Sequence, residues 1–238
     1  MSEMLLVEVK FLTGQINFMA HYYPKSKVET EGFIARYYDE LMNIITCGRY
    51  SLFIEEAIKS MKIRPTDRIL DLGAGTGRNA CLMMRYLSKE GELIGVDVSG
   101  EMISQFKKKC ADFPNIKIIY ARIDQSLPFR EKFDKVFMSF VLHGFPQNAR
   151  ETIMDNVCNA LKENGEFHIL DWNEFDLKAL PFYQRIFFSL IECPYAFDFV
   201  RQDWKEILAN HDFGGFEEYF FFKGFLRLLK AKNYKKRK

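Results

Sequence analysis

Three glycines at alternate positions follow a short apolar run and can form a ligand-binding turn. The run is Arg68–Leu72, and the glycines are Gly73, Gly75 and Gly77. Because glycine has no Cβ atom, the backbone can adopt positive φ there and a ligand can lie directly against the main chain. A helix that begins near Arg78 would point its unpaired N–H groups at the same place. The pattern predicts a nucleoside-binding loop between a strand and a helix.

The spacing of these glycines separates two kinds of nucleoside site. Dinucleotide sites use G-x-G-x-x-G, in which the last glycine allows close packing of helix and strand. Here the third glycine comes one residue early, and Arg78 stands where the dinucleotide pattern needs glycine. The sequence therefore disfavours an NAD-type oxidoreductase.

A carboxylate stands where it can reach a bound ribose. Asp97 ends a second buried run, Leu93–Asp97, about 20 residues beyond the last glycine, and in that position it can accept hydrogen bonds from both ribose hydroxyls. Its alternative role is to cap the entry of the next helix, although Ser99 is also a suitable N-cap. We expect Asp97 to bind the ligand.

The longer pattern resembles the class I S-adenosylmethionine (SAM) dependent methyltransferases. Leu70–Gly77 is similar to the family's first motif, and later stretches resemble its strands in the same order. These stretches are Asp97–Met102, Ile118–Phe129 with a D-x-x-x-L-P-F exit, Phe133–His143, and Gly165–Asp171.

The resemblance covers Ile34 to Lys232 and is nearest to the C-methyltransferases of menaquinone and ubiquinone biosynthesis. Ile34–Asp39 is similar to the I-A-x-x-Y-D motif of that group, and Ser139–Leu142 to its S-F-x-L loop. The chain departs from the group at Leu142–Gly144, where L-H-G replaces the usual L-R-N.

The resemblance implies that SAM is the cofactor. Asp97 would anchor the ribose, Asp124 would accept from the adenine amino group, and Ile123 would pack on the adenine ring. The expected cofactor-binding residues are Tyr38, Asp71, Gly73, Gly75, Gly77, Asp97, Val98, Met102, Ile123, Asp124 and Phe140. Two of them keep an alternative: Asp71 can hold the methionine end or hydrogen-bond the glycine loop, and Tyr38 can close over that end or belong to the core.

His143 is the candidate catalytic residue. It follows the fourth strand at the carboxyl edge of the sheet, and its ordinary pKa near ~6.5 lets it accept a proton at neutral pH. Methyl transfer from a sulfonium depends mainly on alignment, so a base is needed only if the acceptor must lose a proton. The alternative is a histidine that only shapes the pocket.

The alternation of strand and helix patterns predicts an α/β fold. We expect strands at 68–72, 92–97, 116–121, 133–139 and 165–171, helices at 78–89, 100–112 and 147–162, and helices at 30–45 and 50–61 before them. Two strand-like runs within 216–230 then form a hairpin. The expected fold is a Rossmann-like class I methyltransferase, with a seven-stranded mostly parallel sheet, an antiparallel closing hairpin and an N-terminal helical cap.

The domain organisation follows from the same pattern. Residues 1–30 form an irregular N-terminal extension, ordered or partly disordered, and residues 31–232 form a single domain. Residues 174–203 are rich in aromatic side chains and form a helical cap insert, either as core or as a pocket wall for an apolar acceptor. The basic end, Lys230–Lys238, is predicted to be a solvated tail, with residues 233–238 outside the domain, or a weak contact to an anionic membrane.

Composition excludes several classes of function. The formal charge is +2, from 34 basic and 32 acidic side chains, so there is no basic footprint for nucleic acid. The five scattered cysteines predict reduced core thiols in a cytoplasmic protein and not a zinc site or a disulfide frame. No run approaches the ~18 apolar residues of a membrane span.

The sequence therefore predicts a SAM-dependent methyltransferase that acts on a small, apolar or aromatic acceptor such as a quinone precursor. No metal site is expected, and the oligomeric state stays open. A noncatalytic SAM-binding regulatory protein would keep the glycine loop and Asp97, and only turnover of SAM separates the two functions.

Overall fold

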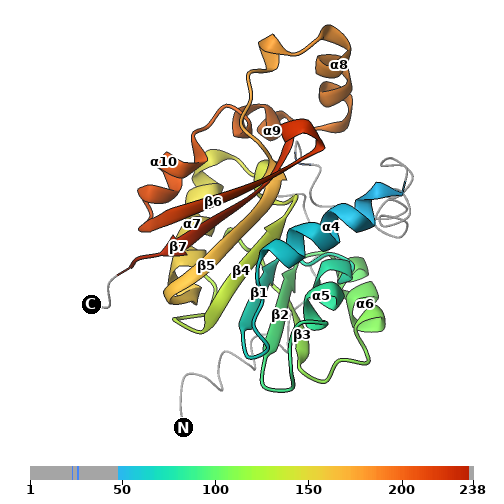
Figure 1. Cartoon of the computed structure of the whole chain (residues 1–238), viewed down its shortest axis with the longest axis vertical. Helices are drawn as coiled ribbons and strands as arrows, with labels where there is room; N and C mark the ends of the chain where they lie inside the picture. The colour runs from blue at the N-terminus through green and yellow to red at the C-terminus, as the bar shows by residue number, and fades with distance from the viewer. Residues whose placement is uncertain (1–22, 24–25, 27–47, 236–238) are drawn as a thin grey trace.

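A seven-stranded sheet forms the centre of the molecule in the computed structural model (Figure 1). The structure describes Tyr23, Ser26 and residues 48–235. The strands are β1 (Arg68–Leu72), β2 (Glu92–Asp97), β3 (Ile116–Tyr120), β4 (Phe133–Ser139), β5 (Leu161–Trp172), β6 (Phe213–Phe221) and β7 (Leu226–Asn233). Their order across the sheet is β3-β2-β1-β4-β5-β7-β6.

The first five strands pair in parallel, and β7 is antiparallel to both of its neighbours, β5 and β6. The strand order reverses between β1 and β4, and open α/β sheets bind ligands at the carboxyl ends of the strands beside such a point. The predicted fold is confirmed, including the antiparallel hairpin that closes the sheet.

Helices cover both faces of the sheet. They are α4 (Arg49–Ser60), α5 (Arg78–Met84), α6 (Gly100–Lys109), α7 (Gln147–Ala160), α8 (Phe182–Ile191), α9 (Pro194–Phe199) and α10 (Trp204–Ala209). The 3₁₀ turns are η1 (Leu142–Gly144), η2 (Leu177–Ala179) and η3 (Phe222–Gly224). Helices α5 and α6 are shorter than predicted. Their C-caps are Arg85 and Cys110, whereas the sequence predicted ends at residues 89 and 112.

Alternation along the strands divides the core into two layers. In β1, Leu70 and Leu72 join the cluster that contains Ile153 of α7 and Trp204 of α10. Ile69 points the other way and joins the cluster built on α4 and α5. Because both faces of the sheet are covered, the central strands β1 and β2 are short and mostly apolar, and the sequence shows them as apolar runs.

Some predicted segments lie outside the described residues. The helix expected at 30–45, most of the extension at 1–30 and residues 236–238 belong to this group. The helix expected at 50–61 is α4, and residues 174–203 contain η2, α8 and α9.

The basic end of the chain is not a solvated tail from its start. Lys230 lies in β7 and is 6% exposed, and its ammonium contacts Glu166 at 2.7 Å and Glu217 at 3.0 Å. β7 continues to Asn233, which is 1% exposed. Hydrogen bonding to β5 and β6 orders this stretch, so the prediction of a tail from Lys230 is wrong.

Candidate active site

The three glycines of the loop after β1 all have positive φ, at 74°, 54° and 81° for Gly73, Gly75 and Gly77. A Cβ atom on Gly73 would overlap the side chain of Val141, and one on Gly77 would come within 2.8 Å of Phe106. Among the described residues, a Cβ atom on Gly75 would meet nothing within 4 Å. Gly73 and Gly77 are therefore required by packing inside the protein, whereas the space above Gly75 is open to a ligand.

Asp97 fixes the geometry beside that open space. Its Oδ2 accepts from the backbone N–H of Gly75 at 2.8 Å, and its Oδ1 accepts from that of Ser99 at 2.9 Å. Ser99 caps α6 by accepting from the N–H of Met102 at 3.3 Å. Asp97 thus ties β2 to the loop, and a carboxylate with about four acceptor positions keeps capacity for further donors.

Asp71 is a buried carboxylate with an unsatisfied oxygen. It is 2% exposed, and its Oδ2 has no hydrogen-bond partner among the described residues. Burial, and then the charge of Asp97, raises the pKa of Asp71 to about 8. An uncompensated buried carboxyl is costly, so this position favours a cationic ligand group that would restore its charge.

Asp124 is already held by two other side chains. It accepts from the hydroxyl of Tyr23 at 2.8 Å and from two guanidinium nitrogens of Arg122 at 3.0 and 2.9 Å. Burial, followed by the hydrogen bond to Asp124, raises the pKa of Tyr23 to about 12. Tyr23 also packs edge-on against Phe145, with 5.6 Å between ring centres. Sequence reasoning missed Tyr23, because 101 residues separate it from Asp124.

His143 lies in η1 between two carboxylates. Its Nδ1 is 2.7 Å from Oδ1 of Asp171, which comes from β5, and its Nε2 is 3.4 Å from Oε2 of Glu192, which follows α8. Burial by itself lowers the pKa of His143, but Asp171 and then Glu192 outweigh it, so the pKa is raised above its ordinary value. Trp172 Nε1 donates to the other oxygen of Glu192 at 3.0 Å. The histidine is 6% exposed and held from both sides.

Arg150 of α7 holds the turn that carries His143. This side chain is wholly buried, and it donates to the carbonyls of Leu142 at 3.2 Å and His143 at 3.3 Å. It also donates to the carbonyl of Tyr195 in α9 at 2.7 Å and to the carboxylate of Asp198 at 2.8 Å. The sequence offered no signal for this residue, since an arginine on an amphipathic helix is ordinarily solvated.

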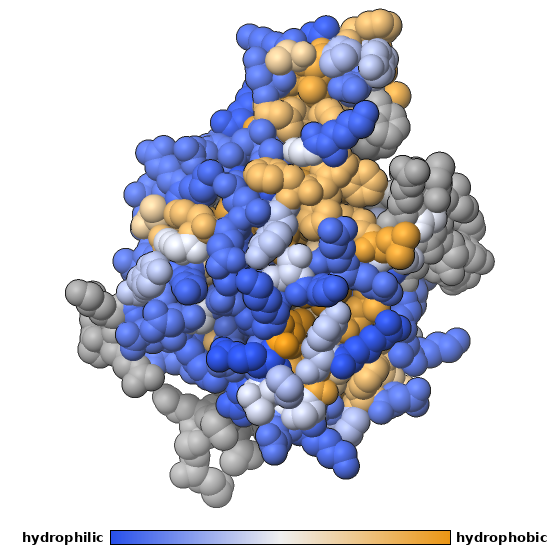
Figure 2. All heavy atoms as spheres, in the orientation of Figure 1, coloured by the Kyte–Doolittle hydropathy of each residue, from blue (hydrophilic) through white to orange (hydrophobic). Residues whose placement is uncertain are grey.

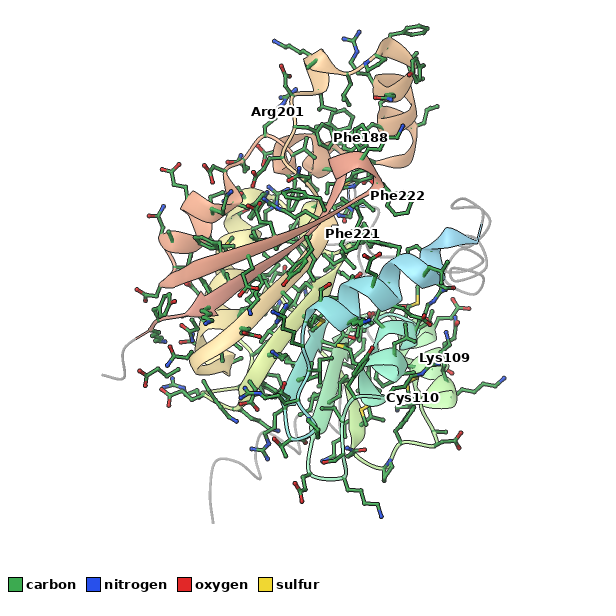
Figure 3. The ribbon with its side chains drawn as sticks, viewed as in Figure 1. Lys109, Cys110, Phe188, Arg201, Phe221 and Phe222 are labelled. Carbon is green, nitrogen blue, oxygen red and sulfur yellow. A yellow bond between two sulfur atoms is a disulfide. The ribbon has the colours of Figure 1, made fainter. Side chains whose placement is uncertain are left out.

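An aromatic cluster lines the same edge of the sheet. Phe140 follows β4 with φ at 55°, and its ring centre lies 6.2 Å from that of Phe53 on α4. The ring of Phe53 in turn lies 4.9 Å from that of Phe221 and 5.2 Å from that of Phe222. Figure 3 labels Phe221 and Phe222 at the tip of the β6–β7 hairpin. A non-glycine residue at positive φ is uncommon and is held here by its surroundings.

Most predicted site residues come together at the carboxyl ends of β1, β2 and β4. Asp71, Gly73, Gly75, Gly77 and Asp97 belong to one neighbourhood, and Met102 and Ile123 are buried beside the following turns at 4% and 6% exposure. Val98 is half-buried between Asp97 and the α6 cap. Tyr38 lies outside the described residues. Among those that the structure describes, no group of three His, Cys, Asp or Glu side chains could hold a metal ion.

The comparison with known families decides what this arrangement is. A methyltransferase domain family matches residues 69–165, which span β1 to the start of β5 and include the glycine loop, Asp97 and His143. Residues 69–165 are therefore a methyltransferase domain, and the sheet that carries them has the class I SAM-dependent methyltransferase fold. The cofactor of this family is SAM.

Two named relatives are quinone C-methyltransferases. The ubiquinone/menaquinone biosynthesis C-methyltransferase of Francisella tularensis subsp. novicida is 26% identical over 64% of this chain and 66% of its own length. The 2-phytyl-1,4-naphtoquinone methyltransferase of Nostoc sp. is 28% identical over 68% of this chain and 72% of its own length. The chain thus spans about two thirds of the length of these curated relatives.

A solved structure supports the fold. The putative O-methyltransferase of Nostoc punctiforme superposes with a TM-score of 0.66, at 16% identity, over 87% of this chain and 64% of its own length. In the part of the chain that the structure describes, no helix is both long and apolar enough to cross a membrane.

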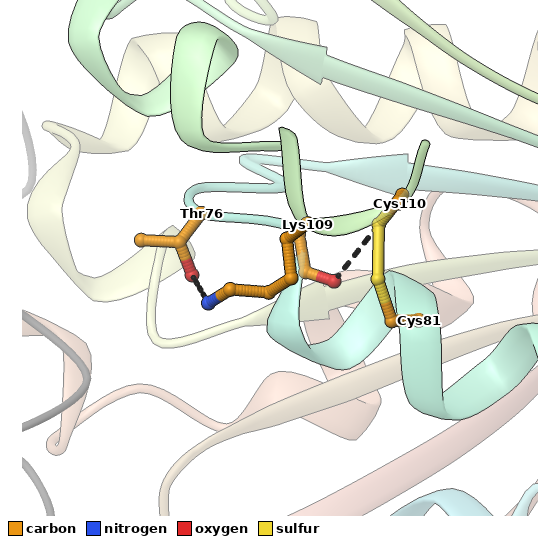
Figure 4. Close-up of a disulfide and its surroundings, with 5 residues drawn as sticks. Thr76, Cys81, Lys109 and Cys110 are labelled. Carbon is orange, nitrogen blue, oxygen red and sulfur yellow. Dashed lines mark hydrogen bonds between the residues drawn. A yellow bond between two sulfur atoms is a disulfide. The ribbon is translucent and has the colours of Figure 1, made fainter. Parts of the chain in front are cut away.

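The prediction of reduced cysteines is wrong for one pair. Cys81 of α5 and Cys110 at the end of α6 form a disulfide, with 5.8 Å between their Cα atoms (Figure 4). The two residues are 29 apart in the chain, and only the side-by-side packing of α5 and α6 brings them together. The Cys110 sulfur also lies 3.5 Å from the carbonyl of Gly77. The prediction of a cytoplasmic location assumed that all cysteines are reduced, so the cysteines no longer support it.

Reduction of this disulfide is expected to lower the free energy of unfolding by about 3 kcal/mol, as cross-links closing loops of this length do. Urea unfolding with and without reductant measures the change. A Cys81→Ala/Cys110→Ala variant is the control, since it should be insensitive to reductant. Equal stability of the wild type in both conditions would contradict the expectation, as would equal thiol titres before and after reduction.

Proposed function

We propose that this protein transfers a methyl group from SAM to a small apolar or aromatic acceptor such as a quinone precursor. The observation that carries the cofactor part is the open space at Gly75, whose backbone N–H donates to Asp97, together with Asp71, a buried carboxyl near enough to feel the charge of Asp97. Asp97 offers hydrogen-bond acceptors for ribose hydroxyls. Asp71 offers a buried carboxylate that needs a cation.

The remaining cofactor roles follow from position. Asp71 pairs with the ammonium of the methionine end, and below pH 8 its carboxyl is mostly protonated until that cation is beside it. Asp124 accepts from the adenine amino group with its remaining capacity, since Tyr23 and Arg122 use three of about four acceptor positions. Ile123, Val98 and Met102 enclose the ring, and Phe140 covers the edge next to the acceptor.

SAM supplies a methyl group already activated by a positive sulfur. The protein's main contribution is therefore alignment, together with exclusion of water by the aromatic side chains around Phe140 and Trp172. Where the acceptor is a phenol or an enolisable carbon, its proton leaves to Nε2 of His143. Asp171 holds the other ring nitrogen and stabilises the imidazolium that results.

The acceptor class is supported by the apolar surroundings of His143 and by the similarity to the quinone methyltransferases. Phe199 lies edge-on to the imidazole at 6.3 Å, and Trp172 and Phe188 pack together at 5.1 Å beside Glu192. Such aromatic walls favour flat apolar molecules.

A turnover assay tests the proposal. The purified protein with SAM and a demethylated quinol, a simple phenol or a primary amine is expected to form S-adenosylhomocysteine fastest with the quinol. No S-adenosylhomocysteine with any acceptor, in a protein that binds SAM, would contradict methyl transfer and would favour a binding protein. Formation fastest with the amine would contradict the acceptor class. In a separate titration of ligand binding, NADH is the negative control and is expected not to bind.

A further inference from the structure

Helix α8 exposes an apolar stripe to solvent. Phe182, Tyr183, Ile186 and Leu190 are 67%, 59%, 53% and 72% exposed. At about 100° per residue these four side chains fall within a sector of about 100° on the helix. We call them the outer face of α8.

The opposite side of α8 attaches the helix to the protein. Phe188 is 4% exposed, and its ring lies 5.1 Å from Trp172, 5.7 Å from Phe175 and 5.1 Å from Phe197. Figure 1 shows α8 at one end of the long axis of the molecule, standing away from the sheet. The helix is therefore apolar on both sides: Phe188 on its inner side packs against the protein, and the outer face is largely exposed.

The hydrophobic surface continues below α8. Figure 2 shows apolar atoms over α8 and over the adjoining face of the molecule. Phe222, at the tip of the β6–β7 hairpin, is 41% exposed, and Lys223 next to it is exposed. Figure 3 places Phe222 beneath Phe188, at the foot of α8. Large contiguous apolar patches of this kind mark interaction sites.

Within the segment 177–191, which lies between Asp176 and Glu192, the charged side chains have one sign. Between Leu177 and Ile191 the charged residues are Lys178 and Arg185, and both are exposed. No acidic residue occurs in that stretch. Aromatic and aliphatic side chains flanked by lysine and arginine suit the boundary between lipid headgroups and acyl chains of an anionic membrane.

We propose that the outer face of α8 docks on the surface of an anionic lipid bilayer. Phe182, Ile186 and Leu190 enter the headgroup region, Tyr183 lies at its level, and Lys178 and Arg185 contact lipid phosphates. Ten residues are too few to span the bilayer, so the helix lies in its surface.

A second copy of the chain fits the outer face of α8 less well than a lipid bilayer does. The four exposed side chains offer on the order of 500 Å², whereas a stable protein interface needs about 800 Å² per partner. A like-charged copy would also bring Lys178 and Arg185 against their equivalents. A bilayer needs neither a matched shape nor a large area, because each inserted side chain contributes separately.

Docking there would place the membrane next to the candidate acceptor site. Glu192 directly follows α8, and its carboxylate lies 3.4 Å from Nε2 of His143. An apolar acceptor could then pass from the bilayer to the histidine without crossing water. This last step rests on the proposed function, whereas membrane docking itself does not.

Flotation of the full chain with vesicles tests the docking. We expect binding to phosphatidylcholine vesicles that contain 30% phosphatidylglycerol, and weaker binding to pure phosphatidylcholine. The variant Phe182→Ser/Ile186→Ser/Leu190→Ser should lose roughly tenfold or more of the partition coefficient. Lys178→Ser/Arg185→Ser should lose most of the preference for the anionic vesicles.

The matched control is Tyr234→Ser. Tyr234 is 51% exposed and follows β7, far from α8 and beside the basic end of the chain. This variant should bind vesicles as the wild type does. The triple variant should keep the melting temperature and SAM affinity of the wild type, which separates loss of docking from loss of the cofactor site.

Three results would overturn the proposal. The first is a wild type that floats with neither kind of vesicle, and the second is a triple variant that binds as well as the wild type, as it would if the basic end alone held the membrane. The third is a wild-type dimer in light scattering that the triple variant converts to a monomer. S-adenosylhomocysteine formation from a water-soluble acceptor is measured separately, so failure of docking and failure of methyl transfer are distinguishable.

Discussion

Replacing Gly75 by valine is expected to weaken SAM binding by at least about a hundredfold. A Cβ atom at Gly75 would meet no atom of the described residues within 4 Å beyond its chain neighbours, so a valine there would enter the proposed ligand space and not the core. Titration calorimetry with SAM or S-adenosylhomocysteine measures the loss.

The control for this substitution is Gly224→Val. Gly224 has φ at 89°, and a Cβ atom there would also meet nothing within 4 Å, but this glycine lies in the hairpin turn η3. Both variants carry the backbone cost of a branched residue at positive φ, about 1–2 kcal/mol. Only the variant at Gly75 should lose the cofactor. Equal SAM affinities of the two variants would refute the assignment of the loop.

Asp97→Ala is also expected to weaken SAM binding, because it removes the proposed hydrogen bonds to the ribose. Loss of charge-assisted hydrogen bonds of about 1.5–3 kcal/mol should weaken SAM roughly tenfold or more. Part of the effect will come through the loop, because Asp97 also holds the N–H groups of Gly75 and Ser99. Asp97→Asn keeps one acceptor oxygen and should fall between the alanine variant and the wild type.

The cofactor loop could be predicted because its causes are local. A turn of this kind needs glycines at specific positions, and a buried parallel strand needs an unbroken apolar run. The run Arg68–Leu72, the positive φ of Gly73, Gly75 and Gly77, and the α6 cap at Ser99 all follow from residues within a few positions of one another.

The surroundings of the histidine could not be predicted in the same way. Asp171 is 28 residues from His143, and Tyr23 is 101 residues from Asp124. Asp171 meets His143 because parallel strands bring their carboxyl ends to one edge of the sheet. No local pattern shows which side chains meet there, or that Tyr23 lies beside Asp124. The same holds for Arg150, whose full burial is a property of the α7–α9 packing, and for the disulfide of Cys81.

The position of Glu192 changes the expectation for His143. A histidine with an ordinary pKa is largely neutral at pH 7 and ready to accept a proton. Here the two carboxylates raise the pKa, so a larger share of the imidazole is protonated at neutral pH. The neutral imidazole that can accept a proton therefore forms only as the pH rises past this raised pKa. The negative charge of Glu192 contributes to how high that pKa is.

His143→Ala is expected to lower kcat by about 10²–10⁴ for a phenol or quinol acceptor, with SAM affinity unchanged. In the wild type, kcat should rise with pH through an inflection above the ordinary histidine value of about 6.5. Glu192→Gln removes a negative charge that favours the imidazolium, so it should move the inflection to lower pH and increase kcat on the acidic side. The control is Glu206→Gln, which alters an exposed carboxylate of α10 and should leave the inflection in place.

Three outcomes decide between a base and a pocket wall. A pH profile that shifts with Glu192→Gln and disappears with His143→Ala supports proton transfer to the histidine. A His143→Ala variant with altered KM and nearly full kcat assigns the residue to the wall of the acceptor pocket. A flat profile in the wild type would mean that the acceptor loses no proton before transfer, and the reaction would then depend on alignment of acceptor, methyl group and sulfur alone.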